Sequence, residues 1–161
     1  MLKPEDWREL DRVLQRYGER HNGPFRRDQG WWQDMTLQLP WHPVSHIVLW
    51  RNDRDEAEGY ALYNQPTGGP DEGKVMVNEL VALSGDAYKN LALFFATHDI
   101  SREIVVYGGP EDVLPLMFAD AERIEIRERF TVMLRVCDFE AAMRLRPAAR
   151  PDEAAEFTLR I

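Results

Sequence analysis

The chain has 161 residues, of which 44% are apolar and 30% are charged, and its formal net charge is −8. This length is typical of a single domain, and the apolar content excludes a disordered chain. The negative charge argues against nucleic acid or an anionic membrane surface as a partner. The sequence carries no apolar run of membrane-spanning length, and its first residues lack the apolar stretch of a signal peptide. We therefore expect a cytoplasmic protein with an ordinary packed core.

Disulfide and metal chemistry are not expected from the sequence. Cys137 is the only cysteine, which excludes an internal disulfide. It follows a predicted strand and has no evident neighbouring base, so we predict a buried, inert thiol. His42 and His46 lie four residues apart, but two prolines and a predicted strand prevent a shared helical face. No metal site is predicted.

The first forty residues predict two helices. One runs from about Pro4 to His21, because Pro4 suits an early helical position and apolar residues recur at spacings of three and four. Asn22-Gly23-Pro24 ends this helix. The second is predicted from Arg26 to Leu37, with Trp31 and Met35 on its inner face.

Three strands are predicted next. His46 to Trp50 and Gly59 to Tyr63 are apolar and flank a charged turn, which predicts a hairpin. Lys74 to Leu83 is the longest predicted strand. We expect a β-bulge at Asn78-Glu79, where polar residues interrupt its middle.

The following region alternates between helices and strands. Asp86 to His98 is apolar on nearly all sides, as in a helix buried against a sheet. The β-branched residues of Glu103 to Tyr107 predict a central strand. A short helix fits Asp112 to Ala119, and Arg123 to Glu128 followed by Phe130 to Val136 predicts a second hairpin.

The last predicted helix runs from Asp138 to Arg146 and is capped by Asp138. Pro147 to Asp152 is typical of a linker, and Phe157 to Ile161 of the beginning of a strand. Residues 1–146 therefore predict one α/β (α+β) domain, with a mixed, mostly antiparallel sheet and helices on both faces. The order of elements resembles that of the GNAT acetyltransferases.

GNAT enzymes hold the diphosphate of acetyl-CoA on backbone N–H groups between the fourth strand and the next helix. Their loop pattern is Arg or Gln, two residues, Gly, one residue, then Gly or Ala. The matching stretch here, Leu80 to Leu91, has Gly85 as its one glycine and no arginine or glutamine in place. Asp86 is predicted to cap the helix with its carboxylate and so repel an anion, and Lys89 would offset only part of this repulsion. We treat Ser84, Gly85 and Asp86 as a degenerate loop and expect this chain to bind no cofactor.

Glu79 is the one catalytic candidate. It lies mid-strand, where many GNAT enzymes place a general base that works through water, and the alternative interpretation is a polar residue at a bulge. The superfamily's general-acid tyrosine follows the fifth strand, yet Gly108 to Phe118 contains no tyrosine. Tyr107 precedes that segment, and we expect it to point into the core or along the strand.

Several segments resemble the middle domain of the Eis (enhanced intracellular survival) family. These bacterial N-acetyltransferases join two GNAT-like domains to a C-terminal domain of sterol-carrier-protein type. The matching pieces keep their order and spacing between Leu10 and Arg146, and they are the Trp31-Trp32 helix, Gly59 to Tyr63, Glu79 to Ala82, Asp112 to Asp120 and Leu134 to Asp138.

Outside these pieces the resemblance has one extension and one departure. Residues 147–161 fall where the family has the linker to its third domain and that domain's first strand. The departure is Glu128-Arg129, at a hairpin turn where the family commonly has Asp-Gly.

The resemblance implies a role for the chain within a larger enzyme. In that family the first domain binds acetyl-CoA, and the active site lies between the first and middle domains. The general acid lies in the first domain and the terminal carboxylate in the third, so Ile161 is not that carboxylate. Members acetylate amines, including aminoglycosides and protein lysines, and form hexamers. The chain itself is then expected to be non-catalytic, with other domains of the same polypeptide and an amine substrate as partners in a homo-oligomer.

Trp31 and Trp32 are the candidates for a wall of the substrate cavity. Adjacent helical residues point about 100° apart, so both cannot face one core. One of them could contact an amine by a cation–π interaction, or both could pack at a domain interface.

Two other functions stay open. One is an autonomous acetyltransferase that uses Glu79 and a divergent cofactor loop, and the other is a small-molecule or partner-binding module. A domain normally covered by neighbours would expose apolar surface, so we also predict that the isolated chain self-associates.

Overall fold

The computed structural model describes residues 7–21, 24–37, 46–98, 101–109, 112–117, 120, 123–128 and 136–145. They fall into two compact units, Met1–Ala121 and Glu122–Ile161. The sheet lies in the first unit, together with every residue that carries the candidate site. None of the helices in the described ranges is both long and apolar enough to cross a membrane.

Helix α1 (Trp7–Gly18) confirms the first predicted helix. Its buried residues Leu10, Val13 and Leu14 form one stripe along the helix, as the spacing of three and four requires. Glu9 in the first turn and Arg16 in the last complement the helix dipole. The stripe is the part of α1 that contacts the sheet.

The second helix differs from its prediction. Residues 29–30 are helical and are followed by the π-helix η2 (Trp31–Leu37), so the helix begins later than Arg26. Asp28 accepts a 2.8 Å hydrogen bond from the Trp31 N–H and caps this start. Trp31 is 46% exposed whereas Trp32 is fully buried, so the inner-face prediction for Trp31 is wrong. The side chain of Met35 lies outside the described part of the chain.

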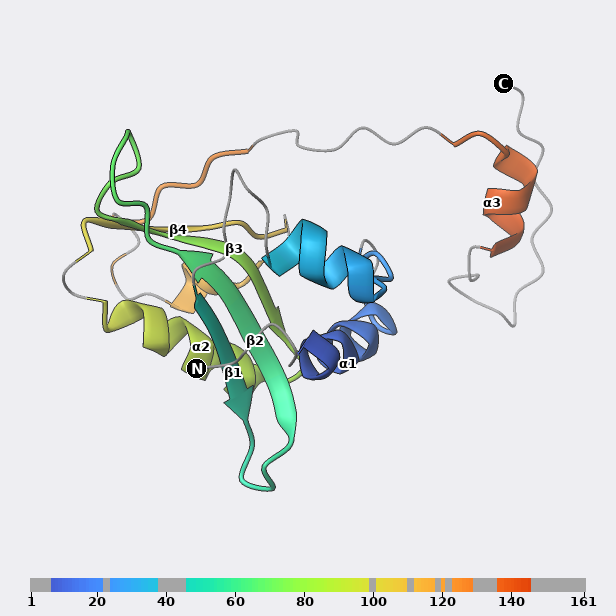
Figure 1. Cartoon of the computed structure of the whole chain (residues 1–161), viewed down its shortest axis with the longest axis horizontal. Helices are drawn as coiled ribbons and strands as arrows, with labels where there is room; N and C mark the ends of the chain where they lie inside the picture. Colours follow the sequence, from blue (N-terminus) through green and yellow to red (C-terminus); the bar gives the residue numbers. More distant parts are fainter. Residues whose placement is uncertain are drawn as a thin grey trace. The chain divides into compact units, whose positions relative to one another are not determined.

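The sheet has the order β1-β2-β3-β4, with antiparallel pairing among β1, β2 and β3 and parallel pairing between β3 and β4. The strands are β1 (His46–Arg51), β2 (Ala57–Asn64), β3 (Lys74–Ala82) and β4 (Glu103–Val106). The mixed, mostly antiparallel sheet that the sequence predicts is therefore confirmed (Figure 1).

The predicted bulge is present in β3. Leu62 pairs with Glu79 and the next residue, Tyr63, pairs with Val77, so Asn78 is the extra residue. Because of this insertion, Glu79 and Val81 face one side of the sheet while Val77 faces the other. The bulge is what turns the Glu79 side chain toward α1 and η2.

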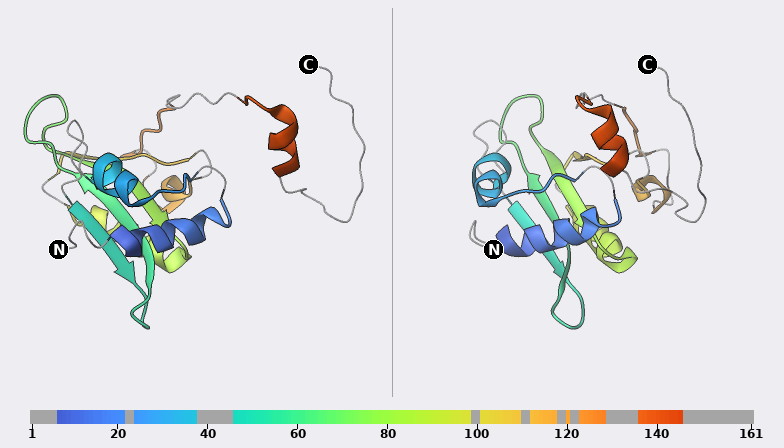
Figure 2. Two further views of the ribbon diagram at one scale, coloured as in Figure 1. Left: turned by 45° about the vertical axis from the view of Figure 1, so that its right-hand side comes forward. Right: turned by 90° about the vertical axis from the view of Figure 1, so that its right-hand side faces the viewer.

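Each face of the sheet carries its own core. Residues of α1 and η2 cover one face, where the buried side chains are Leu10, Val13, Leu14, Trp32, Tyr60, Leu62 and Val81. Helix α2 (Gly85–Ala96) covers the other, where they are Ala61, Tyr63, Val75, Val77, Leu91 and Phe95. Figure 2 shows α1 and η2 together on the side opposite to α2. Helices on both faces are thus confirmed.

A close approach between β2 and α2 requires glycine at position 59. A Cβ atom there would lie 3.1 Å from Leu91 Cδ1, 3.1 Å from the Val81 carbonyl oxygen and 3.2 Å from Ala87 Cβ. No side chain separates the strand from the helix at this point, so α2 packs directly on the backbone of β2.

The region after α2 follows the prediction in part. Strand β4 pairs with β3 alone among the described residues, and Ile104 is 37% exposed, so the central position predicted for this strand is not seen there. Tyr107 is 47% exposed, so its side chain does not lie in the core, which was one of its two predicted positions. Its N–H donates to the Val77 carbonyl and extends the pairing by one residue. The predicted helix at Asp112 to Ala119 is represented by the short 3-10 helix η3 (Leu114–Met117).

In the second unit, helix α3 (Phe139–Leu145) confirms the last predicted helix. Asp138 caps it by accepting a 2.9 Å hydrogen bond from the Ala141 N–H, as expected. Residues 123–128 form no strand, because no described segment pairs with them. Residues 129–135 and 146–161 lie outside the described ranges, and with them the second half of the predicted hairpin, the linker and the last strand. Cys137 is exposed, so the prediction of a buried thiol is wrong.

Candidate functional site

Glu79 sits at the centre of a polar network on the α1 face of the sheet. Arg27, which precedes η2, donates from Nη1 to Glu79 Oε1 at 3.1 Å and from Nη2 to Oε2 at 2.6 Å. The Tyr60 hydroxyl of β2 donates to Oε1 as well. Both carboxylate oxygens are therefore engaged. We call Asp11, Arg27, Trp32, Tyr60 and Glu79 together the Glu79 network.

The two tryptophans take different roles around this network. The Trp32 indole N–H donates to Asp11 Oδ1 of α1 at 2.9 Å, and its ring packs edge-on against Tyr60. The Arg27 guanidinium lies 4.7 Å from the centre of the Trp32 ring, in cation–π contact. Trp31 is 46% exposed, whereas Trp32 is fully buried. Of these two tryptophans, Trp31 is therefore the one that is accessible to a ligand.

Burial and the charge of Glu79 shift the pKa values of two side chains in the network, Tyr60 and Arg27. Burial, and then the charge and hydrogen bond of Glu79, raise the pKa of Tyr60 well above its ordinary value. Burial lowers the pKa of Arg27, but the hydrogen bond and charge of Glu79 outweigh it and leave that pKa raised. Arg27 Nε is buried without a hydrogen-bond partner. The Arg27 guanidinium thus pairs with Glu79 through its two terminal nitrogens, while the N–H at Nε makes no hydrogen bond.

A general base needs a carboxylate oxygen that can accept a proton from the substrate or from a water. Both carboxylate oxygens of Glu79 already accept hydrogen bonds from Arg27 or Tyr60, and the side chain is 22% exposed. The geometry therefore favours the alternative interpretation of Glu79, a structural polar residue at a bulge. Sequence reasoning missed Arg27, because its partner lies in a strand 52 residues later and no local pattern joins the two.

The N-terminus of α2 is capped by Ser84 and not by Asp86, which corrects the sequence prediction. The Ser84 hydroxyl accepts a 3.2 Å hydrogen bond from the Ala87 N–H, and the side chain of Asp86 is exposed. The same hydroxyl donates to Glu58 Oε2 of β2 at 2.8 Å. Serine is favoured at this position because its extended backbone and short hydroxyl reach the third residue of the helix.

Glu58 brings a carboxylate to this helix terminus. Its hydrogen bonds from Ser84 and then from Asn52 hold its pKa below the ordinary value, and the charges of Arg16 and Arg54 act in the same direction. A diphosphate that approached the helix terminus would meet this ionised carboxylate and a hydroxyl already in use. The helix terminus formed by Ser84, Gly85 and Asp86 therefore carries a neighbouring carboxylate on its capping hydroxyl.

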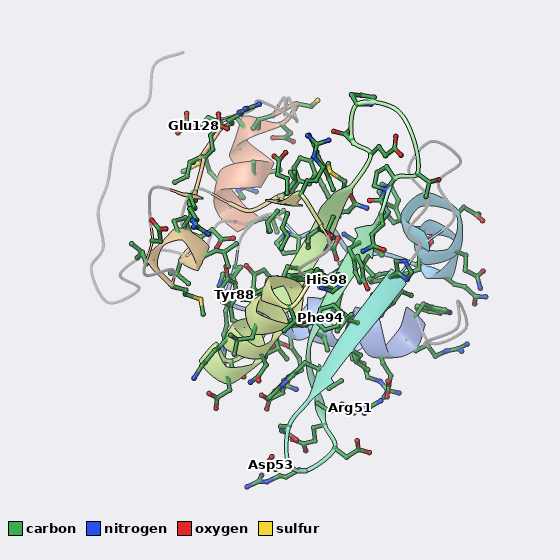
Figure 3. All side chains as sticks on the ribbon, turned by 90° about the vertical axis from the view of Figure 1, so that its left-hand side faces the viewer. Arg51, Asp53, Tyr88, Phe94, His98 and Glu128 are labelled. Carbon is green, nitrogen blue, oxygen red and sulfur yellow. The ribbon has the colours of Figure 1, made fainter. Side chains whose placement is uncertain are left out.

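A second pair of polar side chains joins α2 to the segment after β4. The Tyr88 hydroxyl donates to Asp112 Oδ1, and the same oxygen accepts a 2.9 Å bond from the Leu114 N–H. Burial, and then the hydrogen bond and charge of Asp112, raise the pKa of Tyr88 above its ordinary value. Figure 3 labels Tyr88 on α2, with Phe94 and His98 farther along toward its other end.

A hollow of about 550 Å³ lies at the opposite end of α2, beside Lys74 and His98. Lys74 Nζ is paired with Asp71 at 3.1 Å and with Glu103 at 3.3 Å. His98 Nδ1 lies 3.1 Å from the Phe94 carbonyl oxygen. Both side chains therefore have partners within the protein. No cluster of His, Cys, Asp or Glu within the described ranges could hold a metal ion.

Comparison with known proteins gives one family. A model described as acetyltransferase (GNAT) domain matches residues 23–136. No curated protein matches the chain. Among solved structures, a mutant of the BH1408 protein from Bacillus halodurans aligns with a TM-score of 0.47 and 12% identity, over 84% of this chain and 97% of that one. A tetramutant of the same protein aligns with a TM-score of 0.44 and 13% identity over the same shares.

Proposed function

The chain belongs to the acetyltransferase (GNAT) domain family, and from this premise we propose that it is the non-catalytic middle domain of an Eis-type N-acetyltransferase. Membership of the family implies acetyl-CoA as the cofactor of the parent enzyme. In the proposed arrangement another domain of the same polypeptide binds that cofactor. This domain then forms part of the wall around an amine substrate and part of the scaffold between domains.

The observation that carries the proposal is the state of the α2 N-terminus. A diphosphate needs free backbone donors and a net positive potential there. Ser84 takes the Ala87 donor, and Glu58 holds a carboxylate on the Ser84 hydroxyl. The N-terminus of α2 thus has a negative charge beside it, the Glu58 carboxylate, where the diphosphate of the cofactor would add further negative charge.

The Glu79 network supports the same conclusion from the opposite face of the sheet. The carboxylate at the position of a general base is paired in bidentate fashion with Arg27. To act as a base, Glu79 would have to leave Arg27, whose side chain is 13% exposed and whose charge would then remain unpaired.

Trp31 is the residue that we assign to the substrate wall. The residue is 46% exposed, and the net charge of the chain is −8, which suits polycationic amines. Trp32 is excluded from this role because it is fully buried and its indole N–H is bonded to Asp11. A cation–π contact at an exposed ring contributes about 0.5–1 kcal/mol, or roughly a two- to fivefold change in affinity.

Nuclear magnetic resonance of the full chain tests the assignment. We expect added spermidine to shift the indole N–H signal of Trp31, identified by its loss in Trp31→Phe, and to leave the Trp32 signal in place. Leu93→Ala, at an exposed apolar residue of α2, is the matched control and should not change the titration. A Trp31 signal that stays still at millimolar spermidine would remove Trp31 from the wall.

Calorimetric titration with acetyl-CoA tests the non-catalytic role. We expect no saturable heat up to millimolar cofactor. Micromolar binding together with acetyl transfer to an amine would instead establish the alternative, an autonomous acetyltransferase with a divergent loop.

A further inference from the structure

The side chains around the Arg27 guanidinium belong to regular elements, whereas Arg27 itself does not. Trp32 lies in η2, Tyr60 in β2 and Glu79 in β3. Arg27 lies in residues 24–28, which form neither helix nor strand. A segment without regular structure therefore brings the guanidinium to side chains that helices and strands position.

The side chains that surround the guanidinium are held by contacts that do not involve Arg27. The Trp32 indole N–H is bonded to Asp11 at 2.9 Å, and its ring lies 6.2 Å from the Tyr60 ring, edge to face. The Tyr60 hydroxyl in turn donates to Glu79 Oε1. We call the Trp32 ring face, the Tyr60 hydroxyl and the Glu79 carboxylate the guanidinium pocket. Its walls do not depend on the guanidinium for their positions.

The segment that carries Arg27 has little other attachment to the sheet. Phe25 is 57% exposed, and Arg27 is the only residue of 25–30 that is not classed with the exposed ones. Among the residues that the structure describes, the backbone of 24–28 makes no hydrogen bond to the sheet. The polar attachment of this segment to the sheet is therefore the Arg27 side chain.

The contacts of the pocket suit one chemical group. Arg27 Nη1 and Nη2 donate to the two oxygens of Glu79 at 3.1 and 2.6 Å, and the guanidinium carbon lies 4.7 Å from the centre of the Trp32 ring. A planar guanidinium can make all of these contacts together, whereas an ammonium is a point charge without the two-pronged geometry.

Two features make Arg27 an occupant that can be displaced. Its Nε is buried without a hydrogen-bond partner, so the contact leaves one donor unsatisfied, and release would restore the hydration of that N–H. The side chains of Arg27 and Glu79 are 13% and 22% exposed, so both retain contact with solvent. A small solute can thus reach the pair without unfolding of the sheet.

We propose that the guanidinium pocket is a binding site for small alkylguanidinium ligands, and that Arg27 fills it as a tethered ligand. A ligand of this class displaces Arg27 and releases residues 24–28 from the sheet. The group that is recognised is the side-chain head alone, because this segment offers the sheet no backbone hydrogen bond. A free small molecule is therefore sufficient. The site lies on the α1 face and involves neither acetyl-CoA nor the α2 N-terminus, so it goes beyond the proposed function.

Titration of Arg27→Ala with ethylguanidinium tests the site, because this ion supplies the atoms that the substitution removes. The indole N–H signal of Trp32 in nuclear magnetic resonance is the readout. We expect a saturable shift with a midpoint on the order of millimolar, as for a ligand of so few atoms. The wild type should need at least about tenfold more ligand, because the tethered Arg27 competes. Arg26→Ala, at the exposed neighbouring arginine, is the matched control and should behave as the wild type.

Two further arms test the chemistry of the pocket. Ethylammonium should bind Arg27→Ala at least about tenfold more weakly than ethylguanidinium, because it cannot pair with both carboxylate oxygens. Glu79→Gln in the Arg27→Ala background should weaken ethylguanidinium binding at least about tenfold, since it removes the charge and one acceptor. If Arg27→Ala does not fold alone, about 100 mM ethylguanidinium should restore its folded spectrum by mass action, and ethylammonium should not.

The opposite results contradict the proposal. A Trp32 signal that stays constant in folded Arg27→Ala, or an unfolded variant that the ligand does not restore, would remove the binding site. Equal midpoints in the wild type and Arg27→Ala would show that Arg27 does not fill it. Equal binding of ethylammonium would overturn the class of ligand. None of these results concerns the α2 N-terminus, so each leaves the proposed function standing, and micromolar binding of acetyl-CoA by the wild type would remove that function alone.

Discussion

The α1 face of the sheet buries charged and polar side chains, whereas the α2 face buries mainly apolar and aromatic ones. On the first face, Arg27 and Glu79 pair beneath η2 beside Tyr60. On the second, Leu91 and Phe95 pack on β2 and β3 without an ion pair among the described residues. The difference separates two kinds of structural determinant: one face depends on the fit of apolar surfaces, the other on the completeness of a polar network.

The apolar face offers the largest expected effect. Leu91 is 1% exposed and lies under Gly59, so Leu91→Ala should leave a cavity and cost about 3 kcal/mol of the free energy of unfolding. Leu93 belongs to the same helix but is 52% exposed, and Leu93→Ala should cost less than about 0.5 kcal/mol. Urea unfolding of the two variants measures the contrast. Equal losses would contradict the placement of the α2 core.

The polar face should respond next most strongly, and in a way that apolar packing does not. Glu79→Ala leaves the Arg27 guanidinium and the Tyr60 hydroxyl without their acceptor. Removal of one partner from a fully buried pair costs about 3–5 kcal/mol, and the 13% and 22% exposure of these two side chains reduces the expected loss to about 2 kcal/mol.

The double variant Arg27→Met with Glu79→Leu sharpens this comparison. It removes both charges and restores apolar volume, so it should be more stable than Glu79→Ala in the same urea experiment. A double variant that is less stable than Glu79→Ala would mean that the network contributes more than the mutual satisfaction of its charges.

Tyr60 should make the stability contributed by the α1 face depend on pH in alkaline solution. Its pKa is raised in the folded protein, so its contribution to stability is present below about pH 10, the ordinary tyrosine value, and is lost as the pH rises through the folded pKa. In that window the unfolded chain has released the proton and the folded chain keeps it. Stability should fall by about 1.4 kcal/mol per pH unit for each such tyrosine.

Tyr60→Phe should make the free energy of unfolding fall less steeply with pH above about pH 10, because one ionising group is removed. Tyr63, on the α2 face, has its pKa raised by burial alone, without the carboxylate that acts on Tyr60. Tyr63→Phe should therefore change the slope less than Tyr60→Phe does. Thermal unfolding followed between pH 9 and pH 11 measures both slopes, and a larger change in Tyr63→Phe would reverse the comparison of the two faces.

The contrast between the faces is also the contrast between what the sequence predicts and what it does not. The stripe of α1, the apolar helix α2, the strands β1 to β3 and the bulge at Asn78 all follow from local spacing. The partners of Glu79 do not, because Arg27 and Tyr60 reach it from separate elements. Local patterns can place a polar residue in a strand, but they do not identify its hydrogen-bond partners in other elements.

The positions that the sequence predicts wrongly have the same cause. The sequence predicts the carboxylate of Asp86 as the cap, but Ser84 has the extended backbone that a cap requires, and its hydroxyl is bonded to Glu58 of the neighbouring strand β2. Spacing places Trp31 on the inner face, but η2 is a π-helix and it is Trp32 that is buried, with its indole N–H bonded to Asp11 of another helix. Each outcome depends on a contact between distant residues.

The state of the α2 N-terminus is tested most directly by the amide signals of Gly85 to Tyr88 during titration with acetyl-CoA. These are the backbone groups that a bound diphosphate would contact. With Ser84 and Glu58 in place, their chemical shifts should stay constant up to millimolar cofactor. Saturable shifts of these amides at micromolar acetyl-CoA would contradict the account.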